Sequence, residues 1–223
     1  MSRVITLAQL QRWLLDYADK IDEQAPLLTE LDAAIGDADH GANMVRGMST
    51  VRSRLLDQSE PFADVGALFR TVAMTLISSV GGAAGPLYGA FFMRAAKDPS
   101  GNNTTGDSVT IAQLAQMFHA GVEGLQQRGK AEPDEKTMLD VLQPAAQALE
   151  QAAQAGDSPR AALAAALEAA RGGMVHTVEL EAAKGRASYL GPRSVGHQDP
   201  GATSAYFLIE ALAIVIQNEQ SGE

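Results

Sequence analysis

Apolar residues recur along the chain at helical spacing, and this period dominates the sequence. The first stripe comprises Leu10, Trp13, Leu14, Tyr17 and Ile21. Spacings of three and four residues place such side chains on one face of an α-helix. Alternation of apolar and polar residues between hairpin turns is absent from the sequence, so no strand is predicted.

Helix start signals support this reading. Two pairs have the spacing of a capping box, in which side chain and backbone cap each other: Thr6 with Gln9, and Thr110 with Gln113. Ser158 and Pro159 are typical of an N-cap and first helical position, ahead of an alanine-rich helix over 160–184. Further stripes predict helices over 40–56, 64–79 and 86–97, one carrying Met138, Leu142, Ala145 and Leu149, and a last one carrying Tyr206, Ile209, Leu212, Ala213 and Ile216. Gly129 is interpreted as the glycine that ends a helix. The pattern predicts one all-α domain over 1–223, with about eight antiparallel helices joined by short links.

This topology divides the loops into two sets, because alternate loops of an up-and-down bundle lie at the same end. The loops after the second, fourth and sixth helices are polar and unremarkable: 57–64, 98–109 and 156–158. The other set holds the clustered aspartates, glycines and arginines: 32–40, 80–85, 129–136 and 185–201. Loops on a rigid scaffold commonly carry function, so we expect a site at this second end.

Three carboxylates, Asp32, Asp37 and Asp39, lie close together between glycines. Hard divalent cations bind such oxygen ligands. Asp37 or Asp39 could instead cap the following helix, but a single cap needs only one carboxylate. Magnesium is favoured over calcium, because it is usually held by few carboxylates together with phosphate oxygens and water.

Two other loops suit a phosphorylated ligand. Residues 81–85 are small and enter a helix, so their backbone N–H groups can cradle a phosphate, although a tight helix–helix turn would look similar. The loop over 185–201 is long for a bundle, and its Arg186 and Arg193 carry forked donors suited to phosphate oxygens. It could instead form a surface lid. His40 adjoins the aspartates and could contact phosphate or adenine, or carry a phosphoryl group itself.

The amino-acid composition limits the classes of binding partner that the chain is expected to have. Twenty-seven acidic against 17 basic residues give a net charge of −10, which disfavours nucleic acid and anionic membranes. No apolar run in the sequence approaches the roughly 18–20 residues of a membrane span, and no signal peptide is recognised. The absence of cysteine from the sequence fits a cytoplasmic protein.

Five segments together resemble the DhaL family, the ADP-binding subunits of bacterial dihydroxyacetone kinases: 35–41, 78–89, 128–133, 184–191 and 196–204. The resemblance runs in order along almost the whole chain. It implies an eight-helix antiparallel barrel with the nucleotide at one end. It also implies that Asp32, Asp37 and Asp39 bind two Mg²⁺ ions bridging the ADP phosphates.

The resemblance further implies nucleotide contacts at His40, Gly41, Ala42, Asn43, Ala83, Ala84, Gly129, Met138, Arg186, Asp199, Pro200 and Gly201. Ala84 departs from the family, in which a serine often stands there, and this puts one phosphate contact in doubt. The resemblance also implies a bound coenzyme, because family members that form a separate subunit commonly keep ADP bound in this role.

In such members a phosphohistidine partner, DhaM, rephosphorylates the ADP, and the resulting ATP phosphorylates dihydroxyacetone held on DhaK. This chain would then need no covalent nucleophile, and none is assigned. Three alternatives stay open: an ATP-dependent sugar kinase subunit with exchangeable nucleotide, a non-catalytic nucleotide-binding regulatory module, and a phosphohistidine carrier at His40. The family includes homodimers as well as single subunits.

Overall fold

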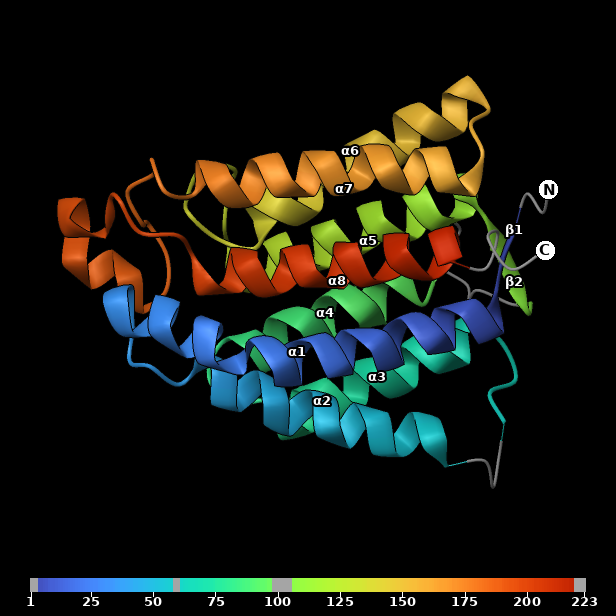
Figure 1. Ribbon diagram of the computed structural model, residues 1–223, viewed down its shortest axis with the longest axis horizontal. Helices are drawn as coiled ribbons and strands as arrows, with labels where there is room; N and C mark the ends of the chain where they lie inside the picture. The colour runs from blue at the N-terminus through green and yellow to red at the C-terminus, as the bar shows by residue number, and fades with distance from the viewer. Residues whose placement is uncertain (1–3, 58–60, 98–105, 219–223) are drawn as a thin grey trace.

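The computed structural model describes residues 4–57, 61–97 and 106–218. Over these residues the chain forms α1 (Leu7–Ile35), α2 (His40–Leu56), α3 (Val65–Ser79), α4 (Ala84–Ala95), α5 (Ile111–Gly129), α6 (Leu139–Ala155), α7 (Pro159–His176) and α8 (Pro200–Asn218). A 3₁₀ helix, η1 (Arg186–Ser194), precedes α8. The prediction of an all-α fold is confirmed, and Figure 1 shows the helices lying alongside one another.

The helices form a closed ring, because each packs against the next in sequence and α8 packs against α1. Aromatic side chains fill the interior. Trp13 of α1 lies 6.0 Å from Phe69 of α3, 6.2 Å from Phe92 of α4 and 6.4 Å from Phe118 of α5, measured between ring centroids. The Trp13 indole N–H donates to the Leu208 carbonyl of α8 at 2.7 Å. One aromatic core therefore ties five of the helices together.

Two short strands correct the prediction that the chain contains none. β1 (Val4–Thr6) pairs antiparallel with β2 (Ser108–Thr110), with Ile5 opposite Val109. Both central residues are buried. Three residues are too few to leave a recognisable alternation in the sequence. Each strand leads directly into a helix, and both predicted capping boxes are present, at Thr6 with Gln9 and at Thr110 with Gln113.

Some helix ends differ from the predictions. α1 continues through Pro26 to Ile35, so Asp32 lies in its last turn instead of in the following loop. α7 ends at His176, well before residue 184, and η1 occupies the middle of the predicted long loop. The left-handed residue after α5 is Lys130, with φ 49°, and Gly129 is the last residue of the helix itself. Of the loop predicted over 98–109, residues 98–105 lie outside the described part, as do 58–60 of the loop over 57–64.

α8 is long and apolar enough to cross a membrane by length and composition alone, with a mean hydropathy of 1.3 over an 18-residue window. In this structure 72% of that window is buried. Its apolar side chains pack against α1, α6 and α7, which explains its composition as that of a core helix.

Candidate functional site

Four helices begin at one end of the barrel. α2, α4, α6 and α8 start there, beside η1, whereas the odd-numbered helices start at the end that holds β1 and β2 (Figure 1). Aligned peptide dipoles give each helix a partial positive charge at its N-terminus. This end of the molecule therefore favours an anionic ligand, and it is the end predicted from the loops.

The two ends differ in how their helices are capped. Side chains cap the helices that start at the strand end: Thr6 for α1, Asp64 for α3, Thr110 for α5 and Ser158 for α7. The cap residues of α2, α4 and α6 make no side-chain cap bond: Asp39, Ala83 and Met138. Within the described residues, the amides of Gly41, Ala42 and Ala84 donate to no protein acceptor. Such N–H groups are suited to phosphate oxygens.

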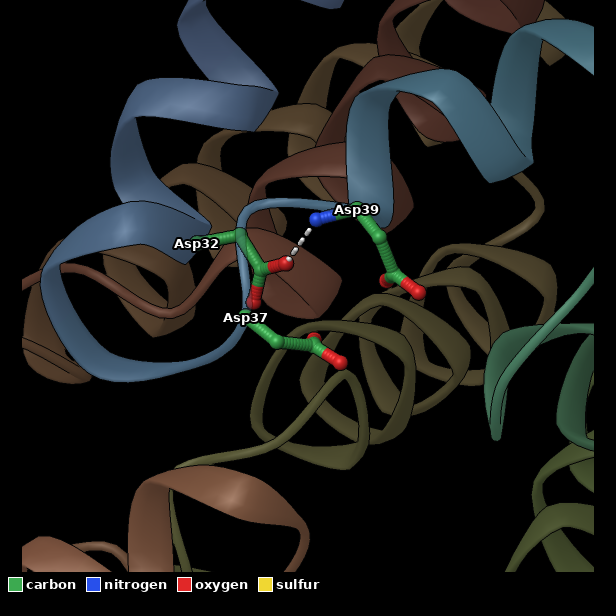
Figure 2. A group of neighbouring side chains, drawn as sticks. All are labelled: Asp32, Asp37 and Asp39. Carbon is green, nitrogen blue, oxygen red and sulfur yellow. Dashed lines mark hydrogen bonds between the residues drawn. The ribbon is translucent and has the colours of Figure 1, made fainter.

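The three aspartates converge beside these helix starts (Figure 2). One carboxylate oxygen from each of Asp32, Asp37 and Asp39 lies within 4.8 Å of the others. Asp32 is only 8% exposed, and its Oδ2 accepts the backbone N–H groups of Asp39 at 2.8 Å and His40 at 3.0 Å. Asp32 thus caps α2 from the preceding helix. Neither Asp37 nor Asp39 caps it with its side chain, the alternative to metal binding considered from the sequence.

This arrangement fits a divalent cation. Three neighbouring carboxylates repel one another unless a cation neutralises them, and Mg²⁺ prefers oxygen ligands of this kind. Gly36 is required beside them, because a Cβ there would lie 2.0 Å from Asp32 Oδ1. Arg186 of η1 also forms an ion pair with Asp37, with its Nε 2.6 Å from Asp37 Oδ2. This pair brings a cationic side chain to the cluster.

Two adjoining cavities open at this end. The smaller, of about 180 Å³, is lined by the three aspartates together with Asn43, Gly81 and Arg186. The larger, of about 500 Å³, has an apolar wall that includes Leu87, Leu125 and Met138. His40, Ala83, Ala84 and Asp199 line both. An acidic chamber beside a mainly apolar one matches a metal–phosphate group joined to a flat organic base.

The structure brings most of the predicted nucleotide contacts to these cavities: His40, Asn43, Ala83, Ala84, Gly129, Met138, Arg186, Asp199, Pro200 and Gly201. Gly41 and Ala42 line neither cavity. Gly41 is buried against α1, and Ala42 is exposed. What the two residues offer is a pair of backbone amides in the first turn of α2, and these donate to no protein acceptor within the described residues. Arg193 is exposed and also lines neither cavity.

A buried chain of hydroxyl groups holds His40. Its Nε2 lies 2.9 Å from Ser204 Oγ, which lies 2.9 Å from the Tyr88 hydroxyl, and Tyr17 donates to Tyr88 at 3.3 Å. Burial lowers the pKa of His40, and the nearby charges of Asp32 and Asp39 partly offset this. Burial thus disfavours the charged ring, and its Nε2 is already engaged by Ser204.

Several residues that line the larger cavity were not predicted as contacts from the sequence: Pro86, Leu87, Leu125, Arg128, Ala131, Lys136, Thr137 and Lys184. Five of them do lie in the segments that carry the family resemblance: Pro86, Leu87, Arg128, Ala131 and Lys184. The apolar ones belong to ordinary helical stripes or turns, so nothing in their spacing distinguishes a cavity wall from core. Lys136 lies in a loop and is 1% exposed, which no local pattern indicates.

Comparison with known proteins agrees with this geometry. A family model described as the DAK2 domain matches residues 34–214. The ADP-binding subunit DhaL of the PEP-dependent dihydroxyacetone kinase of Escherichia coli (strain K12) is 45% identical over 210 residues, which are 94% of this chain and 97% of that protein. The corresponding subunit of dihydroxyacetone kinase 1 of Listeria innocua is 42% identical over 201 residues, which are 90% of this chain and 92% of that protein.

A solved structure shares the fold. The dihydroxyacetone kinase of C. freundii in complex with AMP-PNP and Mg²⁺ is 25% identical, with a TM-score of 0.71. The match covers 93% of this chain but 34% of that one. The sequence motifs, the barrel and the near full-length similarity agree: the chain belongs to the DAK2 domain family and, within it, to the DhaL family.

Proposed function

We propose that this chain forms a single cytoplasmic domain that holds ADP through two Mg²⁺ ions as a bound coenzyme. The nucleotide is phosphorylated by a DhaM-type phosphohistidine donor, and the phosphoryl group passes to dihydroxyacetone on a DhaK-type subunit. The observation that carries the proposal is the pairing of three converging aspartates with unclaimed amides at the starts of α2 and α4. This combination suits a metal-bound polyphosphate.

Each part of the ligand has a matching surface. Asp32, Asp37 and Asp39 would hold the metal ions, and the amides of Ala42 and Ala84 would donate to phosphate oxygens. The apolar wall of the larger cavity suits the adenine ring. Bound Mg²⁺ would neutralise charge on the phosphates during transfer.

Residues of this chain position the nucleotide without bonding covalently to it. Arg186 extends from η1 to the aspartates and pairs with Asp37 through Nε. Its two Nη groups can then donate to a terminal phosphate. His40 is unsuited to carry a phosphoryl group on Nε2, since that atom is held by Ser204 in a buried chain. We therefore assign no catalytic nucleophile here, and the sugar site belongs to the partner.

The first experiment is mass spectrometry of nucleotide released by denaturing freshly purified protein, with Mg²⁺ present throughout purification. Near-stoichiometric ADP supports the coenzyme proposal. An empty protein that binds ATP reversibly instead indicates an ATP-dependent kinase subunit, which the AMP-PNP complex of the C. freundii kinase makes the second candidate. A protein that binds neither nucleotide contradicts both.

A variant pair tests the metal ligands. Asp37→Ala should lose retained ADP and phosphoryl transfer when the partner subunits and donor are supplied. Asp157→Ala is the matched control, because Asp157 is exposed between α6 and α7 at the opposite end. Full activity of Asp37→Ala would remove Asp37 from the site. Acid-labile phosphoryl label on the protein instead of on the nucleotide would support the phosphohistidine carrier at His40. Bound nucleotide without any phosphoryl transfer would indicate a regulatory module.

A further inference from the structure

The loop between α5 and α6 is held by a buried lysine. Lys136 is 1% exposed, and its Nζ donates to three backbone carbonyls: Thr177 at 2.5 Å, Leu180 at 3.1 Å, and His197. An ammonium group carries three hydrogens and accepts no hydrogen bond. All three donors are therefore committed to the protein, and none is left for a ligand, although Lys136 lines the larger cavity.

The three carbonyls belong to separate parts of the site. Thr177 follows the last residue of α7, Leu180 lies in the turn beyond it, and His197 lies two residues before Asp199. Thr177 is itself fully buried, and its hydroxyl accepts the backbone N–H of Asp199 at 3.1 Å. Lys136 and Thr177 thus connect the loop after α5, the end of α7 and the start of α8.

The backbone of the same loop is also constrained. Asp134 and Lys136 have left-handed conformations, with φ 64° and 59°, which non-glycine residues keep only where the surroundings hold them. The Asp140 carboxylate accepts the backbone N–H of Asp134 at 2.6 Å and that of Thr137 at 2.8 Å. The loop is thus fixed at its backbone by Asp140 and at its side chain by the carbonyls around Lys136.

We propose that Lys136 is a positioning residue for the nucleotide pocket: it joins the loop after α5 to the Asp199–Gly201 turn and so sets the width of the larger cavity. This inference rests on the proposed function, because that cavity is the one assigned to the base. Lys136 acts without touching the nucleotide. The positive charge also complements the carbonyl end of the α7 dipole.

The test replaces Lys136 by Met, which keeps an unbranched apolar side chain of nearly the same length but removes the ammonium group and its three donors. ADP affinity in the presence of Mg²⁺ should fall about 10- to 100-fold, since misplacing binding groups by about 1 Å has effects of that order. Lys20→Met is the matched control, because it removes a half-buried lysine that pairs with Glu210 at 3.1 Å and lines neither cavity. It should leave ADP affinity unchanged.

Hydrogen–deuterium exchange separates a positioning role from general destabilisation. In Lys136→Met, amide exchange should rise over 130–137, 177–183 and 196–199. The Asp199 amide, which donates to Thr177, reports directly on the link between the end of α7 and the start of α8. Exchange should not rise over 36–42, around the aspartates. Unchanged affinity and exchange, or a rise spread evenly over all helices, would overturn the proposal. If the Met variant does not fold, Lys136→Gln should show the same local pattern. Failure of the unmodified protein to bind ADP would contradict the proposed function, while the exchange comparison would still test the role of Lys136.

Discussion

Asp199 occupies the N-cap of α8 at the point where the two cavities meet, and its Oδ2 accepts the Ala202 N–H at 2.6 Å. Burial raises the pKa of its carboxyl to about 7 from an ordinary value of 3.8, although the Ala202 amide and the charge of Lys136 oppose the rise. Between these two pH values the folded protein keeps a proton that the unfolded chain releases. The stabilisation from that proton is complete below about pH 4 and is lost as the pH rises to about 7.

The prediction is that Asp199→Asn removes this dependence in metal-free protein. The wild type should lose free energy of unfolding relative to the variant between pH 5 and 7, by at most about 1.4 kcal/mol per pH unit, and not above pH 8. Urea unfolding in EDTA measures this difference, and asparagine remains a good N-cap. Asp64→Asn makes the same replacement at the N-cap of α3 and shows what a changed cap does by itself. A constant difference between wild type and Asp199→Asn across this range would contradict the prediction.

The contact between α1 and α2 depends on one glycine. A Cβ at Gly41 would lie 2.4 Å from both the Ala25 carbonyl oxygen and Thr29 Oγ1, so alanine would push the start of α2 away from α1. We expect Gly41→Ala to lower the free energy of unfolding by about 1–3 kcal/mol, as overpacking does. Gly172→Ala in α7 meets nothing within 4 Å and should raise it by about 0.5–1 kcal/mol, the usual helical preference.

Urea unfolding of the two variants side by side provides the measurement. Because His40 and Asp39 stand at the same end of α2, Gly41→Ala should also weaken Mg²⁺ and ADP binding, whereas Gly172→Ala should not. If Gly41→Ala were as stable as the wild type, the close approach of the two helices could not be the reason for glycine at this position.

The elements that the sequence predicted well are those defined by nearby residues. Thr6 and Gln9 form a capping box within four residues, and the stripe from Leu10 to Ile21 needs only the helical period. The aspartate cluster was also recognisable, because its members are close in sequence. The pairing of β1 with β2 joins segments about a hundred residues apart, and each is too short to carry a pattern.

Other features depend on the assembled fold. Asp32 caps α2 only because α1 continues through Pro26 and places it opposite the next helix. The buried ammonium group of Lys136 is satisfied by three carbonyls that all lie beyond residue 176. Such residues follow from contacts between distant segments, which periodicity and motif spacing do not encode.

At the scale of the whole molecule, the site assembles opposite charges at one end of a strongly acidic protein. Three aspartates need a cation, while the free helix starts need an anion. Each ligand therefore relieves the repulsion that the other would meet alone. We expect Mg²⁺ and ADP to bind with positive coupling instead of independently.

Thermal unfolding of nucleotide-free protein with Mg²⁺, ADP or both tests this coupling. Saturation with both at about 100 times the dissociation constant should raise the melting temperature by about 5–10 °C, well beyond the sum of the separate shifts. Linkage further requires that Mg²⁺ strengthen ADP binding by the factor by which ADP strengthens Mg²⁺ binding, which titration in both directions measures. Asp37→Ala should abolish the excess and Asp157→Ala should retain it, since only Asp37 belongs to the cluster. Simply additive shifts in the wild type would mean that the aspartates and helix starts do not act on one shared ligand.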